Sequence, residues 1–383
     1  MSITTPAGFS AAATTAGLKP SGSPDLALVR NLGPEYAAAG VFTSNRVKAA
    51  PVLWSQRVVA DGRLEAVILN SGGANACTGP DGFADTHRTA ETVAEKLEIG
   101  AVDVAVCSTG LIGLRLPMDN LLAAIPTVAR GLTVQGGPDA ARAIMTTDSV
   151  PKQAVVQRQG WSLGGMAKGA GMVAPGLATM LVVLTTDASV PSADLDAALR
   201  VATRKTFDRA DSDGCMSTND TVLIMANGAS GETPATDDFT EALTELCADL
   251  AAQLIADAEG AAHEIAITVQ NAASEDEAVT VGRAVARSNL FKCAVFGGDP
   301  NWGRVLSAVG TTDATFEPDA IDVIFNGVQV CRSGGIGDPR EGVDLSGRHV
   351  DLVIDLHAGD QQATILTNDL TYDYVKENAE YST

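Results

Sequence analysis

Short apolar runs alternate along the chain with stretches in which apolar residues recur at helical spacing. The apolar runs, rich in branched residues, predict strands at residues 65–70, 102–107, 180–184, 264–270, 322–325, 351–356 and 362–366. The clearest helix pattern covers residues 240–258, where leucines 243, 246, 250 and 254 fall on one stripe. Similar spacing predicts helices over 84–97, 192–206 and 276–288. The pattern therefore indicates a mixed α/β chain.

Several of these predicted strands are separated only by short turns, which favours antiparallel pairing. Residues 326–347 are rich in glycine and charge and are expected to form a loop. A chain of 383 residues is long enough for two domains and a large core, although no change of composition marks a boundary between them.

One glycine-rich segment, residues 164–178, stands out because it carries a single charge, Lys168, and runs through Pro175 directly into the predicted strand 180–184. We expect a loop here, since glycine allows tight folding and close approach of the backbone. Thr179 is then a lone hydroxyl at a loop-to-strand junction. Such a threonine suits a nucleophile that becomes a new N-terminus and uses its own α-amine as base. Composition alone favours the plainer interpretation, an ordinary strand threonine.

Composition limits the classes of partner. The formal net charge is −21 and aromatic residues make up only 4% of the chain, so nucleic acids and anionic membranes are not expected partners. The longest apolar runs are too short to span a bilayer, and the N-terminus lacks the basic start of a signal peptide, which predicts a cytoplasmic protein. The six cysteines are scattered without a CxxC pair and are expected to be small buried apolar residues in a reducing compartment.

Other familiar chemistries lack sequence support. The four histidines show no HExxH spacing, and no G-x-S-x-G motif is present, so we expect neither a catalytic metal nor a serine nucleophile elbow. Residues 169–174 do match the dinucleotide pattern G-x-G-x-x-G/A. No apolar strand is expected directly before them, and a strand rather than a helix follows. A non-catalytic nucleotide-binding protein is therefore a weak alternative.

Several longer motifs carry a resemblance that covers almost the whole chain. They are NSGGANACTG (70–79), CSTGLIG (107–113), IMTTD (144–148), GGMAKGAGMVAPGLATML (164–181), DGCMSTNDT (213–221), DAEG (257–260), FGGDPNWGRVL (296–306) and YVKENAEYST (374–383). With these motifs the chain resembles the glutamate N-acetyltransferase, or ornithine acetyltransferase, family of arginine biosynthesis.

The resemblance implies a self-processing enzyme. The chain would be cut between Ala178 and Thr179 into an α chain (1–178) and a β chain (179–383), with Thr179 as nucleophile. The implied fold is a sandwich of stacked, mainly antiparallel sheets flanked by helices, like that of N-terminal-nucleophile hydrolases, with a smaller C-terminal domain. The implied assembly is an (αβ)2 heterotetramer, and no metal or organic cofactor is expected.

The resemblance also assigns roles to individual residues. Thr109 and Gly110, expected in a turn after the strand 102–107, would form the oxyanion hole; a hydroxyl and a backbone N–H suit that role. Substrate contacts would come from Thr146, Lys168, Thr179, Glu259, Asn378 and Thr383. Lys168 suits a substrate carboxylate. Glu259, expected at the end of the helix 240–258, suits the ornithine ammonium.

The implied reaction is transfer of acetyl from N2-acetyl-L-ornithine to L-glutamate through an acetyl-Thr179 intermediate. The sequence leaves open whether acetyl-CoA is a second donor. It also departs from the family pattern at Ala262 and His263, where a hydroxyl residue and a lysine are usual. The alternative enzyme is an N-terminal-threonine amidohydrolase or β-aminopeptidase on a related fold.

Overall fold

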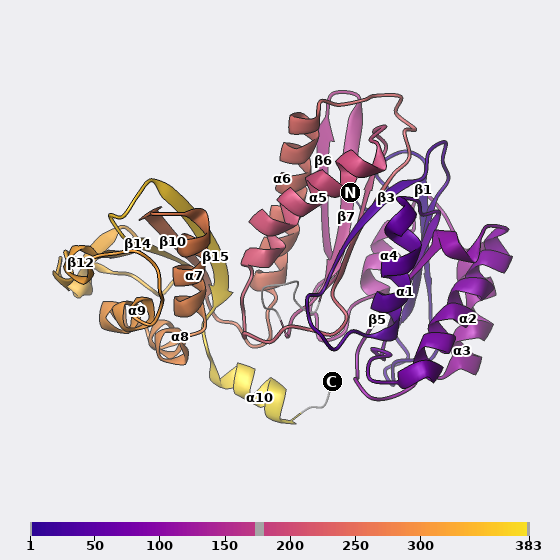
Figure 1. Cartoon of the computed structure of the whole chain (residues 1–383). Coiled ribbons are helices and arrows are strands. Elements are labelled where there is room, and N and C mark those ends of the chain that lie inside the picture. The colour runs from indigo at the N-terminus through magenta and orange to yellow at the C-terminus, as the bar shows by residue number, and fades with distance from the viewer. Residues whose placement is uncertain (1, 173–179, 381–383) are drawn as a thin grey trace.

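The computed structural model describes residues 2–172 and 180–380, and within them the strands form three sheets (Figure 1). Two sheets, with orders β1-β2-β4-β5 and β3-β9-β8-β7-β6, stack on each other, and the third, β13-β12-β11-β14-β10-β15, lies beside them. Antiparallel pairs dominate, and each sheet also contains a parallel pair: β4 with β5, β8 with β9, and β10 with β14. The expectation of stacked, mainly antiparallel sheets is confirmed.

The first sheet supplies the strand that ends at the site. Its strands are β1 (Phe9–Thr14), β2 (Leu26–Asn31), β4 (Ala66–Ser71) and β5 (Val104–Thr109). Four helices pack against these strands or each other: α1 (Ala50–Val58), α2 (Gly79–Leu97), α3 (Met118–Arg130) and α4 (Gly137–Ala143). β4 and β5 are buried along their whole length, as expected for strands covered on both faces.

The second sheet lies between two cores. Its strands are β3 (Ala37–Phe42), β6 (Lys152–Arg158), β7 (Trp161–Lys168), β8 (Leu181–Thr186) and β9 (Thr221–Ala226). Alternate residues of β8 enter different cores: Leu181 and Val183 pack toward the first sheet, whereas Val182 and Leu184 pack toward α5 (Ser192–Lys205) and α6 (Thr236–Ala256). Successive side chains of a strand point to opposite faces, so β8 has to be apolar throughout.

The third sheet has its own core. Its strands are β10 (Glu264–Ala272), β11 (Asp322–Phe325), β12 (Val328–Arg332), β13 (Gly335–Ile336), β14 (His349–Asp355) and β15 (Gln361–Asn368). The helices α7 (Glu275–Ala286), α8 (Asn289–Phe296) and α9 (Trp302–Val309) complete this core. The last helix, α10 (Tyr372–Glu380), extends from the third sheet back toward the sandwich (Figure 1).

Two expectations about loops were wrong. Residues 326–347 contain the strands β12 and β13. The sequence did contain a signal, the dipeptide Asn326-Gly327, which is typical of tight turns between antiparallel strands. In the structure both residues have positive φ (45° and 84°) and join β11 to β12.

Residues 164–168, expected in a glycine-rich loop, belong to β7. Gly164 and Gly165 serve close packing there: a Cβ on Gly164 would lie 2.7 Å from the Ser2 carbonyl oxygen, and one on Gly165 would lie 2.8 Å from Leu250 Cδ1. A buried strand therefore does lead into the G-x-G-x-x-A segment, contrary to expectation. The element that follows among the described residues is β8, so the arrangement still differs from the strand-turn-helix of a dinucleotide site.

Smaller differences concern helix ends and cysteines. α6 runs from Thr236 to Ala256 rather than over 240–258, and its predicted leucine stripe is buried. All six cysteines are free thiols, but only Cys107, Cys247 and Cys331 are buried. None of the helices in the described part of the chain is both long and apolar enough to cross a membrane.

Candidate functional site

A pocket opens where β5, β7 and the turn after α6 meet. Five of the residues singled out from the sequence line it, together with three neighbours: Thr109, Gly110, Thr146, Lys168 and Glu259, with Thr147, Gly171 and Met172. These residues come from four separate motifs, so the fold gathers positions up to 150 residues apart in the chain into one site. Ala178, Thr179 and Thr383 lie outside the described residues.

The end of β5 places a hydroxyl and a backbone N–H at the pocket. Thr109 is the last residue of the strand rather than part of a turn, and its carbonyl accepts a hydrogen bond from Gly73 N–H (3.0 Å). Gly110 follows with φ +127°, and a Cβ there would lie 2.6 Å from the Gly73 nitrogen. Only glycine fits this backbone without strain. The arrangement can donate hydrogen bonds to an oxyanion; that role stays a prediction.

Lys168 ends β7 and is almost completely buried at the pocket wall, with 1% of its surface exposed. Its Nζ lies 3.8 Å from Asp148 Oδ2 and makes no hydrogen bond to any described residue. Burial lowers the pKa of the Lys168 ammonium, and the nearby carboxylates, Asp148 first, oppose this shift. The pocket therefore contains a buried cation from which no described residue accepts a hydrogen bond, and which can pair with an anionic ligand.

The turn after α6 brings an acidic group to the same pocket. Glu259 lies beyond the helix end at Ala256, not at its last turn as expected, and its N–H donates to the Ala170 carbonyl (3.0 Å). Asn378 of α10 donates from Nδ2 to Glu259 Oε2 (3.1 Å). The C-terminal helix thus reaches the site through a contact between Asn378 and Glu259, which were predicted separately as substrate contacts.

The two residues that depart from the family pattern are held by Asp369, although Ala262 lines a second, neighbouring hollow together with Glu259. Ala262 N–H and His263 N–H both donate to Asp369 Oδ1 (3.0 and 2.9 Å), and His263 Nδ1 lies 2.6 Å from Asp369 Oδ2. His263 Nε2 contacts the Leu345 carbonyl (3.0 Å). Neither residue is among those that line the pocket.

Sequence reasoning missed a buried carboxyl group next to the proposed cut. Asp220 Oδ1 accepts a hydrogen bond from the N–H of Met180, the residue after Thr179 (3.1 Å). Burial raises the pKa of Asp220 well above its ordinary value. The adjacent Asn219 donates to the carbonyls of Ala74 (2.7 Å) and Ser108 (2.8 Å). The motif 213–221 therefore ties the start of β8 to the strand that carries Thr109.

It also missed Asp148 and Lys152, which form an ion pair beneath the pocket (2.7 Å). Asp148 lies in the IMTTD motif, but nothing in the sequence signals that it is buried. In residues 2–172 and 180–380, no group of three or more histidine, cysteine, aspartate or glutamate side chains is arranged to hold a metal ion.

Comparisons with known proteins point to one family. The model of the ArgJ family matches residues 10–383. The arginine biosynthesis bifunctional protein ArgJ of Streptomyces coelicolor is 65% identical over 382 residues, and that of Thermobifida fusca is 60% identical over 383 residues; both alignments cover 100% of each chain. The crystal structure of ornithine acetyltransferase from Mycobacterium tuberculosis, complexed with ornithine, is 62% identical with a TM-score of 0.45, covering 47% of this chain and 96% of that chain.

Proposed function

The chain belongs to the ArgJ family, and we propose that it transfers acetyl from N2-acetyl-L-ornithine to L-glutamate in arginine biosynthesis. The observation that carries this proposal is the pocket itself, which combines Thr109 and Gly110 with the cation Lys168 and the anion Glu259. An N-acetylated diamino acid has a matching set of groups: an acyl carbonyl, a carboxylate and an ammonium.

The proposed nucleophile is Thr179, freed as a new N-terminus by cleavage after Ala178. Two neighbours support this placement. Met172 lines the pocket at one end of the intervening segment, and Met180, covalently joined to Thr179, is fixed at the other end by Asp220. Cleavage would follow attack of the Thr179 hydroxyl on the Ala178 carbonyl carbon, which moves the acyl group from nitrogen to oxygen; water then hydrolyses the ester. The products are chains of 178 and 205 residues.

Transfer then proceeds in two acyl steps. The Thr179 hydroxyl attacks the acetyl carbonyl carbon while its α-amine accepts the hydroxyl proton. Thr109 and Gly110 donate to the oxyanion. The C–N bond breaks, the proton passes to the leaving nitrogen, and ornithine departs from acetyl-Thr179. The glutamate amine attacks the ester, N-acetylglutamate leaves, and the Thr179 hydroxyl is restored.

In this proposal the charged residues of the pocket bind the oppositely charged groups of the two substrates. Lys168 would pair with the carboxylate that both substrates carry, and Glu259, held by Asn378, would meet the ornithine side-chain ammonium. Thr146 and Thr383 are proposed as further substrate contacts. We also propose an (αβ)2 assembly, a cytoplasmic location and catalysis without a metal or organic cofactor, with acetyl-CoA as the one additional donor to be assayed.

The decisive experiment supplies acetylornithine with and without glutamate and measures N-acetylglutamate, free acetate and the intact mass of the protein. We expect two fragments and glutamate-dependent N-acetylglutamate. Thr179→Ala should abolish both cleavage and transfer, whereas Thr179→Ser, which keeps a hydroxyl, should retain part of each. Free acetate regardless of glutamate would identify a hydrolase instead. Retained transfer in Thr179→Ala would refute the nucleophile. Parallel reactions with acetyl-CoA, and with a chelator, test the second donor and the absence of a metal.

A further inference from the structure

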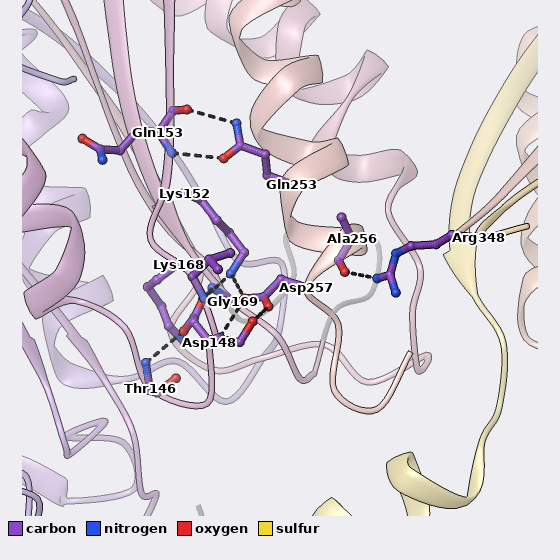
Figure 2. A network of polar contacts seen from close by, with 12 residues as sticks. Thr146, Asp148, Lys152, Gln153, Lys168, Gly169, Gln253, Ala256, Asp257 and Arg348 are labelled. Atoms are coloured by element: carbon purple, nitrogen blue, oxygen red, sulfur yellow. Dashed lines mark hydrogen bonds and ion pairs between the residues drawn. The ribbon is translucent and has the colours of Figure 1, made fainter. Parts of the chain in front are cut away.

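Beneath the pocket, two lysines and two aspartates form one buried cluster (Figure 2). Lys152, at the start of β6, lies between two carboxylates: its Nζ is 2.7 Å from Asp148 Oδ1 and 2.6 Å from Asp257 Oδ2. Lys168 is the fourth member, 3.8 Å from Asp148 Oδ2. The side chains of Lys152 and Asp148 are completely buried, so these charges interact with little screening by water.

The cluster joins three turns that carry pocket residues. Asp148 accepts backbone hydrogen bonds from Thr146 (2.9 Å) and from Gly169 (2.6 Å), the residue after Lys168. Asp257, two residues before Glu259, also accepts the Ser149 N–H (2.9 Å). Lys152 connects the two carboxylates, so it links the positions of Thr146, Lys168 and Glu259 although it does not line the pocket itself.

The distances show how Asp148 divides its hydrogen bonds. Both of its oxygens are occupied, one by Lys152 and Gly169 N–H and the other by Thr146 N–H. Lys168 stays outside hydrogen-bonding distance of this carboxylate. Lys19 is a further cation whose charge interacts with Asp148 and Lys168, without an ion pair to Asp148. With Lys152 present, the four charges sum to zero, and within residues 2–172 and 180–380 no group accepts a hydrogen bond from Lys168. Without Lys152 the cluster would carry one negative charge, and Lys168 would be the remaining cluster cation within 4 Å of Asp148.

We propose that Lys152 is a positioning residue that holds Asp148 and Asp257 and thereby keeps the Lys168 ammonium free for the substrate carboxylate. This inference deepens the proposed function and rests on it. A buried ion pair is a poor device for stability alone, because desolvation of the charges offsets their attraction. By keeping Lys168 available for the substrate carboxylate, the buried charges of the cluster serve substrate recognition.

The test measures what the carboxylate contributes to binding. L-Ornithine and putrescine differ only by the carboxylate. Both are used as inhibitors competing with acetylornithine, and the ratio of the inhibition constant of putrescine to that of ornithine reports the contribution of the carboxylate to binding. In the wild-type protein we expect ornithine to bind more tightly by about 10-fold or more, the size of a charge-assisted hydrogen bond. In Lys152→Met we expect that ratio to fall close to one, with kcat changed much less than the KM for acetylornithine and glutamate.

A second variant separates positioning from folding. Lys152→Met/Asp148→Asn also removes the carboxylate that would capture Lys168, so the ratio should return toward the wild-type value. A merely structural role predicts that the double variant is worse than the single one. Lys292→Met is the matched control, since Lys292 is also a buried lysine, in α8 outside the pocket, and its loss should leave the ratio unchanged.

Three results would overturn the inference: an unchanged ratio in Lys152→Met, a ratio that the Asp148→Asn change fails to restore, or a wild-type protein that binds both amines equally. Melting temperatures of all variants identify any that do not fold. Failure of the proposed function would look different, because the wild-type protein would then make no N-acetylglutamate whatever the ratio.

Discussion

Gly110 shows at the scale of one residue how the site depends on backbone geometry. Its φ of +127° turns the chain sharply after β5, against the backbone of Gly72 and Gly73. Any side chain would both strain this conformation and meet backbone atoms that cannot move aside. The residue therefore matters for the position of its N–H, a property that no side-chain chemistry reveals.

We expect Gly110→Ala to lower acetyl transfer by about 100-fold or more, the usual effect of losing one oxyanion donor, and to destabilise the fold by about 1–3 kcal/mol through strain. Gly113→Ala is the matched control, because Gly113 also has positive φ (+88°) but open space around its Cβ position. It should show a stability loss from strain with activity kept. Rates and urea unfolding of both variants check this; equal activity in the two would contradict the role of Gly110.

Some residues of the site could be predicted from sequence motifs, and others could be found only in the folded structure. Thr109, Lys168 and Glu259 were assigned because they lie in motifs that carry the family resemblance, and the structure brings them to one pocket. Asp148 and Lys152 could not be assigned in this way. Their importance lies in burial and in shared partners from three turns, which exist only after the chain has folded.

At the scale of elements, β7 explains why the glycine pattern was misleading. Gly164 faces the backbone of Ser2 and Ile3, and Gly165 faces Leu250 of α6 and Leu184 of β8. Small residues let this strand lie closely between two layers, and the same composition in isolation is typical of a loop. The leucine stripe of α6 was predictable because helical spacing can be seen in the sequence without knowing which elements pack against the helix.

The two glycines of β7 should respond differently to the same substitution. A Cβ on Gly164 meets a backbone oxygen at 2.7 Å, whereas a Cβ on Gly165 meets the ends of leucine side chains at 2.8 and 2.9 Å, which can rotate. We expect Gly164→Ala to destabilise by about 1–3 kcal/mol, the range for overpacking, and Gly165→Ala by less. Urea unfolding of the pair checks the order, and a larger loss in Gly165→Ala would show that the leucines cannot adjust.

At the scale of the whole molecule, the third sheet is joined to the sandwich by polar contacts. Arg287, the residue after α7, pairs with Asp211 (2.7 Å), whose side chain is fully buried, and Ser212 Oγ donates to Asn368 Oδ1 (2.5 Å). Lys292 donates to the Ser212 carbonyl. A smaller C-terminal domain was implied by the family resemblance and not by the predicted strands and helices. The ionic junction could not be predicted, because its partners lie 76 to 156 residues apart in the chain.

This junction should be sensitive to pH once Arg287 is lost. Burial raises the pKa of Asp211, and Arg287 opposes that shift. A raised carboxyl pKa means that folding favours the protonated form, so the stability contribution is present below the unfolded pKa of about 4 and is lost as pH rises through the folded pKa. We therefore expect Arg287→Gln to lower the free energy of unfolding more at pH 8 than at pH 5. The loss at pH 8 should be about 1–3 kcal/mol, less than for a fully buried ion pair, because the Arg287 side chain is half exposed.

Calorimetry at the two pH values measures this difference. Arg200→Gln is the control, because Arg200 pairs with Asp196 at the surface and should change stability by less than about 0.5 kcal/mol at either pH. A loss in Arg287→Gln that is the same at pH 5 and pH 8 would mean that Asp211 does not titrate between these two pH values, and would contradict the prediction.

The strand order of the second sheet has a kinetic consequence for a chain cut after Ala178. The first product would contain β3, β7 and β6. The second would contain β9 and β8, which lie between β3 and β7 in the sheet. Native products could then separate only by opening the sheet on both sides. Once denatured and diluted, they would have to find each other again, so refolding would change from a first-order process to a second-order one that depends on protein concentration. Cutting the chain after it has folded avoids that search.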